Sequence, residues 1–357
     1  MRGLHGRERL TLGATAGASL DDGWRDRPDP GFQPRSIGRR GVAARLVRRS
    51  AGAARRTDDD GRRSEMADRE QTAVIGLGAM GQGMAHRLVE SGFPTVVFNR
   101  SPGRADGVVA AGATGAGSAA EAAAAGDVVL LSLSDEDAVE DVLGRQGVLA
   151  AMRQGATLLD TSAVGRDFAR RLHERCAAHG VRRVEAAVLG NPLQARGGDL
   201  RVFTAGDPVD VDRVTEVLAA LGSTRVHWGG PGAAAAAKLV FNLVLAAQVA
   251  GLAEAVSVGT DAGLDRELLL VAIAQSGFSS PVLRFRAELM RERRYDPAFF
   301  RTRLMEKDLR LALDAGPTDA YRVLEATRSL FEDAAEAGFA DKDAASVIEH
   351  VTATARG

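Results

Sequence analysis

Lys238 and Asn242 are the residues of this chain whose types and spacing best suit acid–base chemistry. They stand four positions apart in a long helical pattern, so their side chains share one face of the helix. Their neighbours Leu239 and Leu243 are apolar. A lysine placed against a substrate carbonyl can stabilise the charge that develops on the oxygen and can donate a proton to it. A lysine that reaches from the surface along its alkyl stem would give the same pattern, so the pair needs support from other residues.

A glycine-rich loop could bind the phosphates of a dinucleotide. It follows the predicted strand 72–75 and opens a helical pattern at 80–91, which is the context that makes this motif informative. The first glycine permits a tight turn, the second lets the backbone approach a pyrophosphate, and the third lets helix and strand pack closely. Free N–H groups at the helix start would attract the phosphates, whereas an ordinary strand–helix turn is the alternative. This glycine loop consists of Gly76, Leu77, Gly78, Ala79, Met80 and Gly81.

The turn after the second predicted strand bears on the choice of cofactor. NAD-binding sites typically carry Asp or Glu here, about 20 residues after the loop, to hold the ribose 2′-hydroxyl. This chain has Asn99, Arg100 and Ser101 instead. Without a carboxylate to repel it, a 2′-phosphate could bind the Arg100 guanidinium and the Ser101 hydroxyl. The turn therefore favours NADP(H) over NAD(H), although a solvated turn with an incidental arginine would have the same sequence.

Other loops could hold the substrate. Ser162 follows the predicted strand 157–160, and open α/β sheets bind ligands at the C-terminal ends of their parallel strands. Ser162 could bond to a substrate carboxylate or carbonyl, or it could cap a helix. Gly190 and Asn191 lie in a loop whose glycine could expose backbone N–H groups to an anion, or which could be only a turn. Lys307 would by itself lie on the solvated face of an amphipathic helix.

The elements that must position these residues fall into two groups. Strands and helices alternate over residues 69–229, which predicts an α/β domain of the Rossmann type with a doubly wound parallel sheet. After it, every segment has a helical pattern, which predicts an all-helical domain over residues 230–357. The expected strands cover 72–75, 94–98, 128–133, 157–160, 181–184 and 200–204. The expected C-terminal helices cover 233–262, 266–275, 282–293, 302–315, 318–337 and 341–354.

Composition excludes several classes of protein. The 357 residues carry a net charge of −1, so the chain lacks the basic excess of a dedicated nucleic-acid binder. The single cysteine, Cys176, allows no disulfide framework, and with His173 and His179 it provides too few ligands for a structural metal site. The alanine-rich stretch at 231–256 is interrupted by polar residues, so no apolar run is expected to reach the ~18 residues of a membrane span. We expect a soluble, cytoplasmic protein without a metal.

Residues 1–68 differ from the rest of the chain. They are rich in Arg, Gly and Asp and poor in spaced apolar residues, so we expect disorder, because little apolar burial could offset the entropy of ordering them. Acidic residues disfavour a transit peptide. The segment 39–56 could be a nucleic-acid-binding arm or a solvated tail. Met66 directly precedes the first convincing strand, so the segment could also be a mis-assigned gene start.

Taken together, residues 71 to about 350 resemble the β-hydroxyacid dehydrogenase family. This family includes 3-hydroxyisobutyrate dehydrogenases and the tartronate, glyoxylate and succinic semialdehyde reductases. The order and spacing of the motifs across the chain are more specific than any one of them. The resemblance rests on the glycine loop with Gln82 to Ala85 after it, on Asp160-Thr161-Ser162, on Lys238 with Asn242, and on Lys307-Asp308.

The resemblance implies a role for each candidate residue. Lys238 would be the catalytic acid/base, and Asn242 would help to fix the substrate. The long helix that carries them would build a homodimer or a dimer of dimers. Ser162 and the loop of Gly190 and Asn191 would hold the acid group of the substrate. Lys307 would close over the cofactor, which Leu133 and Ser134 at the end of a strand would also contact.

The sequence also departs from the family pattern. Ala163 replaces the threonine of the usual Asp-x-Ser-Thr, while Leu189 and Asn191 replace a serine and a glycine of the usual Asp-Ala-Pro-Val-Ser-Gly-Gly. Losing two hydroxyls weakens the grip expected on a small carboxylate, so a larger or less acidic carbonyl substrate is an open alternative. An imine reductase of the same fold and a non-catalytic NADP-binding module are the competing functions. Both generally lack a lysine at the position of Lys238, so its presence favours the dehydrogenase.

Overall fold

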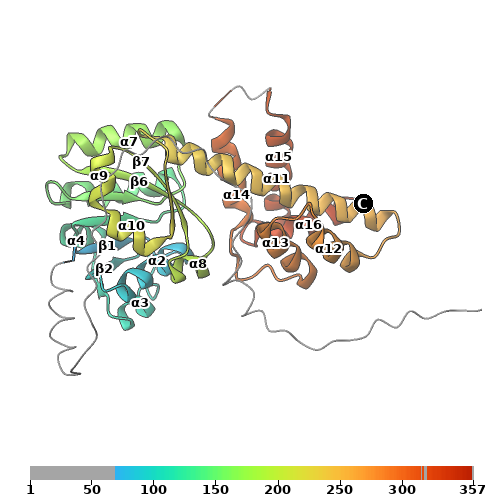
Figure 1. The fold of residues 1–357 in the computed structure, drawn as a ribbon, viewed down its shortest axis with the longest axis horizontal. Coiled ribbons are helices and arrows are strands. Elements are labelled where there is room, and N and C mark those ends of the chain that lie inside the picture. The colour runs from blue at the N-terminus through green and yellow to red at the C-terminus, as the bar shows by residue number, and fades with distance from the viewer. Residues whose placement is uncertain (1–68, 315, 317–319, 356–357) are drawn as a thin grey trace, which may run out of the picture. The chain divides into compact units, whose positions relative to one another are not determined.

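The computed structural model describes residues 69–314, 316 and 320–355. The expectations for residues 1–68 therefore lie outside the described residues. The described residues contain one sheet of eight strands in the order β3-β2-β1-β4-β5-β6-β7-β8. Figure 1 shows this sheet with helices packed against it. The strands are β1 (Thr72–Ile75), β2 (Thr95–Phe98), β3 (Thr114–Gly115), β4 (Val128–Leu131), β5 (Thr157–Asp160), β6 (Arg182–Leu189), β7 (Arg201–Ala205) and β8 (Thr224–His227).

The sheet is doubly wound around β1. From β1 the chain builds outward to β2 and β3 on one side, and then returns to build β4 and β5 on the other. These pairs are all parallel, so the C-terminal ends of β1 and β4 lie side by side at the switch point, where open α/β sheets bind ligands. The predicted fold class, a Rossmann-type domain followed by helices, is confirmed.

One strand pair departs from the prediction of a parallel sheet. β7 runs antiparallel to β6, with Glu185 opposite Ala205 and Leu189 opposite Arg201. The connection consists of residues 190–200, which include only the short helix α8 (Pro192–Gly197). A parallel crossover usually needs about a dozen residues or more, so this connection is too short and the chain turns back. The strands β3 and β8 were not predicted, because each is short or exposed and has no run of apolar residues.

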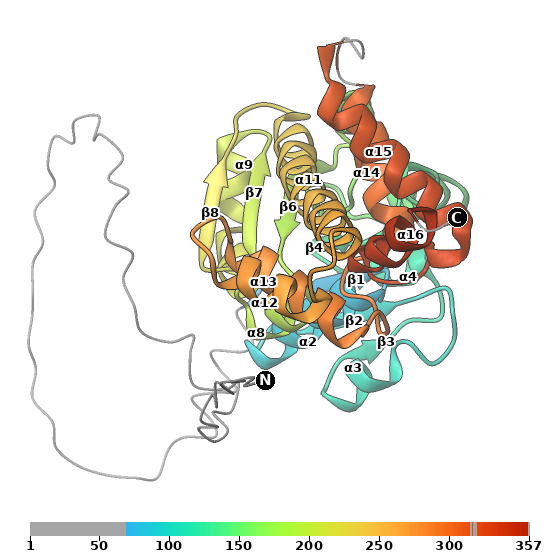
Figure 2. The same cartoon turned by 90° about the vertical axis from the view of Figure 1, so that its right-hand side faces the viewer.

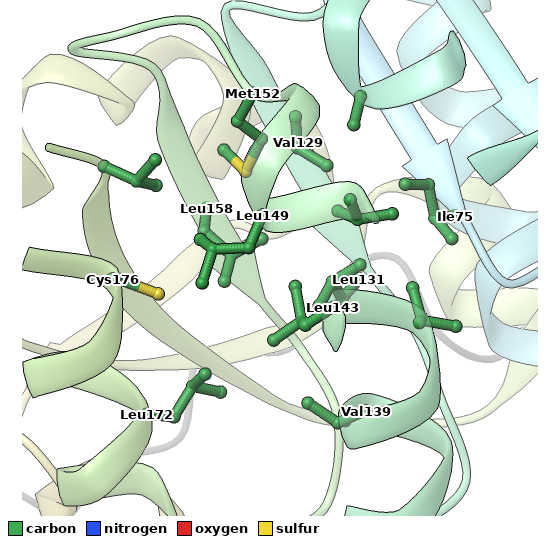
Figure 3. Packing of buried hydrophobic residues seen from close by; sticks show 14 of the residues in the cluster. Ile75, Val129, Leu131, Val139, Leu143, Leu149, Met152, Leu158, Leu172 and Cys176 are labelled. Atoms are coloured by element: carbon green, nitrogen blue, oxygen red, sulfur yellow. The ribbon is translucent and has the colours of Figure 1, made fainter. Parts of the chain in front are cut away.

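Helices cover both faces of the sheet, as the alternation of side chains along β1 shows. Ala73 and Ile75 point into one buried cluster and Val74 into the other. Figure 3 shows the first cluster, in which Ile75 and Leu131 of the sheet pack with Cys176 and other helical residues. The helices are α2 (Ala79–Glu90), α3 (Asp106–Ala110), α4 (Ala119–Ala125), α5 (Glu136–Glu140), the π-helix η1 (Asp141–Arg145), α6 (Val148–Ala151), α7 (Arg166–Ala178), α8, α9 (Pro208–Arg213) and α10 (Thr215–Leu221).

The second part of the chain is all helical in the described residues and is built around α11. This helix contacts β6 and β7 and also every longer helix that follows it. Figure 2 shows α12 and α13 on one side of α11 and α14, α15 and α16 on the other. The elements are α11 (Ala233–Asp261), α12 (Arg266–Gln275), α13 (Pro281–Glu292), α14 (Thr302–Leu313), α15 (Arg322–Ala334), the π-helix η3 (Ala335–Phe339), the 3-10 helix η4 (Ala344–Ser346) and α16 (Val347–Thr354).

The helix α11 is long and apolar enough to cross a membrane by length and composition alone. Its most apolar window has a mean hydropathy of 1.8, and 44% of that window is buried inside the structure. The expectation that no segment would qualify was wrong, because isolated polar residues such as Asn242 and Gln248 do not lower the average enough. The same composition suits the central helix of a packed domain, and the core of this part includes Ala246, Val249 and Leu252.

Candidate active site

The glycine loop connects β1 to α2 and leaves room for a phosphate at one glycine only. Gly76 has a φ of +97°, and a Cβ on it would lie 2.4 Å from the carbonyl oxygen of Ser132. A Cβ on Gly81 would lie 1.9 Å from the carbonyl oxygen of Gly76. Around Gly78, in contrast, a Cβ would meet nothing within 4 Å. The packing of the protein itself therefore requires the first and third glycines, whereas the second borders open space.

The start of α2 has the features of a phosphate site. Gly78 is its N-cap residue and provides no side-chain hydrogen bond to the first turn. The N–H groups of that turn are thus available to a ligand, and the helix dipole favours negative charge there. The loop fits the pyrophosphate of a dinucleotide on these observations.

Asn99 fixes the loop, whereas its two neighbours face solvent. The side-chain oxygen of Asn99 accepts a hydrogen bond from the N–H of Leu77 at 2.8 Å, and its amide donates to the carbonyl of Ser101 at 3.1 Å. Arg100 and the Ser101 side chain are exposed. Asn99 is therefore a positioning residue for the glycine loop, and the other two residues can reach a group at the end of β2.

Ser162 lies where β5 ends and is tied to the neighbouring loop after β4. It is buried, and its N–H donates to Oδ1 of Asp160 at 3.0 Å. Its Oγ accepts a hydrogen bond from the N–H of Leu133 at 3.2 Å. The hydroxyl proton of Ser162 can still be donated, since a serine hydroxyl is both acceptor and donor. Ser134 next to this contact is exposed and bonds to Asp135.

Lys307 ties α14 to the loops after β4 and β5. Its ammonium group donates to the carbonyl of Ser134 at 2.9 Å and to the carbonyl of Ala163 at 2.6 Å. It also lies 2.9 Å from Oδ1 of Asp308, whose Oδ2 accepts a hydrogen bond from the amide of Asn242 at 2.6 Å. Asn242, Lys307 and Asp308 are all buried. These contacts bring the helix pair α11 and α14 to the C-terminal edge of the sheet.

Lys238 lies in the second turn of α11, one turn before Asn242. The residue is only partly buried. Burial lowers the pKa of Lys238, and Lys307 acts in the same direction, while Asp308 and Asp160 oppose it. A lowered pKa makes the ammonium form a stronger proton donor and the neutral amine easier to form.

Gly190 and Asn191 form the start of α8. Gly190 has a φ of +147°, and the side-chain oxygen of Asn191 accepts hydrogen bonds from the N–H groups of Leu193 and Gln194 at 3.0 Å each. The amide oxygen of Asn191 is therefore used as a helix cap. Over the described ranges, no hydrogen bond joins this pair to Lys238 or Ser162.

Three buried charges were not predicted as functional. Asp160, Arg183 and Glu185 are 3%, 2% and 3% exposed. Asp160 and Glu185 occupy adjacent strands in the same register, and Arg183 bonds to both carboxylates. The sequence does contain one feature that could have revealed this cluster. Charged residues inside otherwise apolar strands must find partners when they are buried.

The Rossmann-type sheet, the glycine loop and the lysine on α11 define an NAD(P)-dependent dehydrogenase or reductase. Comparison with known proteins agrees with this class. A family described as the NAD binding domain of 6-phosphogluconate dehydrogenase matches residues 71–230. A second, described as NAD-binding of NADP-dependent 3-hydroxyisobutyrate dehydrogenase, matches residues 232–351.

Individual relatives match over nearly their whole length. The 2-(hydroxymethyl)glutarate dehydrogenase of Eubacterium barkeri is 31% identical over 77% of this chain and 92% of its own. The structure of Mycobacterium tuberculosis 3-hydroxyisobutyrate dehydrogenase with L-serine is 30% identical, with a TM-score of 0.69, over 79% of this chain and 99% of that one. A Streptomyces aurantiacus imine reductase is 26% identical, with a TM-score of 0.54, over 79% and 99%. The chain belongs to the β-hydroxyacid dehydrogenase family, which confirms the resemblance.

Proposed function

We propose that this protein interconverts a β-hydroxyacid, or a related small hydroxy acid, and its aldehyde or keto acid, with NADP(H) as cofactor and Lys238 as acid/base. The observation that carries the proposal is the set of buried contacts from Asn242 through Asp308 and Lys307 to the loops after β4 and β5, because they bring the face of α11 that carries Lys238 to the edge of the sheet where Ser162 lies. Asn242, one turn away on the same face of α11, is buried against Asp308, so this face packs toward α14 and not toward solvent.

In the proposed reaction, the start of α2, Ser162 and Lys238 each have a separate role. The cofactor, when bound, supplies or accepts the hydride. The N–H groups at the start of α2 hold its phosphates, and the hydroxyl of Ser162 donates a hydrogen bond to the acid group of the substrate. In reduction, the ammonium of Lys238 stabilises the charge on the carbonyl oxygen and transfers a proton to it. In oxidation, the neutral amine of Lys238 accepts the proton of the hydroxyl group.

The preference for NADP(H) is supported by the end of β2. Arg100 and Ser101 are exposed there and carry no negative charge, so they can accept a 2′-phosphate that a carboxylate would repel. The second matching family is likewise described as NADP-dependent.

The loop after β6 lacks polar groups that the family pattern offers to a small carboxylate. Leu189 and Asn191 stand where the family pattern has a serine and a glycine, and the side-chain oxygen of Asn191 caps α8. Leu189 packs instead against an apolar cluster that includes Ala187 and Phe203. We therefore favour a substrate with an apolar portion beside its acid group, held mainly by Ser162.

A substrate panel with one variant tests the proposal. Oxidation of NADPH and NADH would be followed with glyoxylate, succinic semialdehyde, tartronate semialdehyde, methylmalonate semialdehyde and a cyclic imine, and the reverse reaction with 3-hydroxyisobutyrate and L-serine. We expect at least one aldehyde acid to turn over, faster with NADPH. Lys238→Ala should slow it ~100-fold or more, the usual worth of a positioned acid–base group. The proposal fails if only the imine reacts, or if Lys238→Ala stays within about tenfold of the parent.

We also propose a homodimer, or a dimer of dimers, in the cytoplasm, with α11 at the subunit interface. Val240, Val244 and Val258 on this helix are 59%, 54% and 69% exposed. They lie on the side of α11 away from its own core, with the exposed Gly251 and Glu254 between Val244 and Val258, and we call these three valines the apolar stripe. A second copy covering this stripe would account for a helix whose composition also fits a membrane span.

A further inference from the structure

A chain of buried charges connects the Ser162 loop to the start of α11. The N–H of Ser162 donates to Oδ1 of Asp160 at 3.0 Å, and Oδ2 of Asp160 accepts from Arg183 at 2.7 Å. Arg183 also donates to Oε1 of Glu185 at 3.1 Å. The carboxylate of Glu185 in turn accepts from the N–H of Gly232 at 2.5 Å and from that of Ala235 at 3.2 Å. We call Asp160, Arg183 and Glu185 the ion-pair chain.

The helix α11 depends on the ion-pair chain for its N-terminal cap. Its own N-cap residue is Gly232, which has a φ of +88° and provides no side-chain hydrogen bond. A Cβ at Gly232 would lie 2.8 Å from the carbonyl oxygen of Arg166, so no capping side chain fits at this position. Glu185 from β6 supplies the missing acceptor, and its negative charge is favourable at the positive end of the helix dipole.

The ion-pair chain places one arginine between two carboxylates, so it carries a net charge of −1, which the positive end of the α11 dipole at Glu185 partly offsets. Asp160 and Glu185 are register partners on adjacent strands, so two buried carboxylates stand side by side. Arg183 lies on the same face of β6, two residues before Glu185, and its planar fork reaches both carboxylates and the carbonyl of Ala169 on α7. Burying three charges costs desolvation energy that apolar residues would avoid, so stability alone gives no reason for them.

We propose that the ion-pair chain sets the distance between Ser162 and Lys238, with Arg183 and Glu185 as positioning residues for catalysis. One end holds the backbone of Ser162, and the other holds the first turn of α11, directly before the turn that carries Lys238. A change at either link moves the acid/base relative to the substrate-binding serine. This inference rests on the proposed role of Lys238.

The variant Glu185→Gln tests the positioning role of the ion-pair chain with little disturbance of the fold. Glutamine keeps an oxygen that can accept from Gly232 but loses the charge that Arg183 and the helix dipole need. We expect kcat with the best aldehyde acid to fall about tenfold or more, since a catalytic group misplaced by about 1 Å can cost ~100-fold. The dissociation constant of NADPH should stay within about twofold of the parental value, because the ion-pair chain does not include the glycine loop.

Two further variants make the result specific. Arg183→Lys keeps the charge but cannot bridge two carboxylates, so it should also lower kcat. In the Lys238→Ala background, Glu185→Gln should add no more than about a twofold loss, because both act through the same group. Glu349→Gln is the matched control: it removes the charge of a partly buried ion pair with Arg266 between α12 and α16, and kcat should not change.

Failure of this inference differs from failure of the proposed function. If Lys238→Ala retains activity, the proposed function is wrong. If Lys238→Ala is slow but Glu185→Gln and Arg183→Lys both keep the parental kcat, the positioning role is wrong. The same holds if the losses in the double variant multiply, or if only thermal stability changes.

Discussion

At the scale of single residues, neighbouring charges shift the pKa of Lys238 in opposite directions. Its burial and the neighbouring Lys307 favour the neutral amine, whereas Asp308 and Asp160 favour the ammonium. Asp308 is central to this balance, because it also accepts from Asn242 and pairs with Lys307. Because these influences oppose one another, a change in any one neighbour should alter the protonation of Lys238.

The balance predicts a pH effect for Asp308→Asn. In the proposed mechanism reduction needs protonated Lys238, so the rate should fall as pH rises through the pKa of this lysine, which lies below its usual value. Removing the Asp308 charge removes an influence that raises this pKa, so the fall should move to lower pH. The measurement is kcat for reduction against pH.

Asp314→Asn serves as the control, since Asp314 is an exposed carboxylate at the C-cap of the same helix α14. Its profile should match that of the parent protein. A fall that stays in place or moves to higher pH in Asp308→Asn would contradict the assignment of the titrating group to Lys238.

At the scale of elements, the glycine loop separates packing from ligand binding. Gly81→Ala would place a methyl group 1.9 Å from the carbonyl oxygen of Gly76. Overpacking of this kind costs ~1–3 kcal/mol, and each kcal/mol lowers Tm by about 2–4 °C in a domain of this size. Gly78→Ala meets no protein atom, so Tm should hold while NADPH binding weakens about tenfold or more, or roughly 1.4 kcal/mol.

Thermal unfolding and cofactor titration of the two variants check this contrast. Gly144→Ala is a suitable reference, because a Cβ there also meets nothing within 4 Å and Gly144 lies in η1, away from the loop. It should change neither quantity. If Gly78→Ala binds NADPH like the parent protein, the phosphates do not approach the backbone at Gly78.

The same elements show what the sequence could and could not predict. The glycine loop, the central strands and the helices after residue 230 were predictable, because periodicity and strand–helix alternation are local signals. The antiparallel β7 and the exposed strand β8 were not, since pairing depends on connection length and on neighbouring strands. Asn242 was predicted from its spacing to Lys238 and Lys307 only from the family resemblance, whereas Arg183 was missed because its partners, Asp160 and Ala169, come from other elements.

At the scale of the whole molecule, α11 carries both the proposed acid/base and the proposed subunit interface. One face of it carries Lys238 and Asn242, and its buried residues form the centre of the helical core. The remaining face presents the apolar stripe of Val240, Val244 and Val258 to solvent. Exposed apolar side chains that share one side of a helix are typical of surfaces that another protein covers.

The stripe predicts a dimer that one charge disrupts. Val244→Asp would bury an unpaired carboxylate in the interface, which is strongly unfavourable, so the protein should change from a dimer to a monomer of 37.4 kDa. Val209→Asp is the control, because Val209 is 61% exposed but lies on α9, away from α11. Light scattering after size exclusion measures both masses. A monomeric parent protein at every concentration, or a Val244→Asp variant that remains dimeric, would show that the stripe is not the subunit interface.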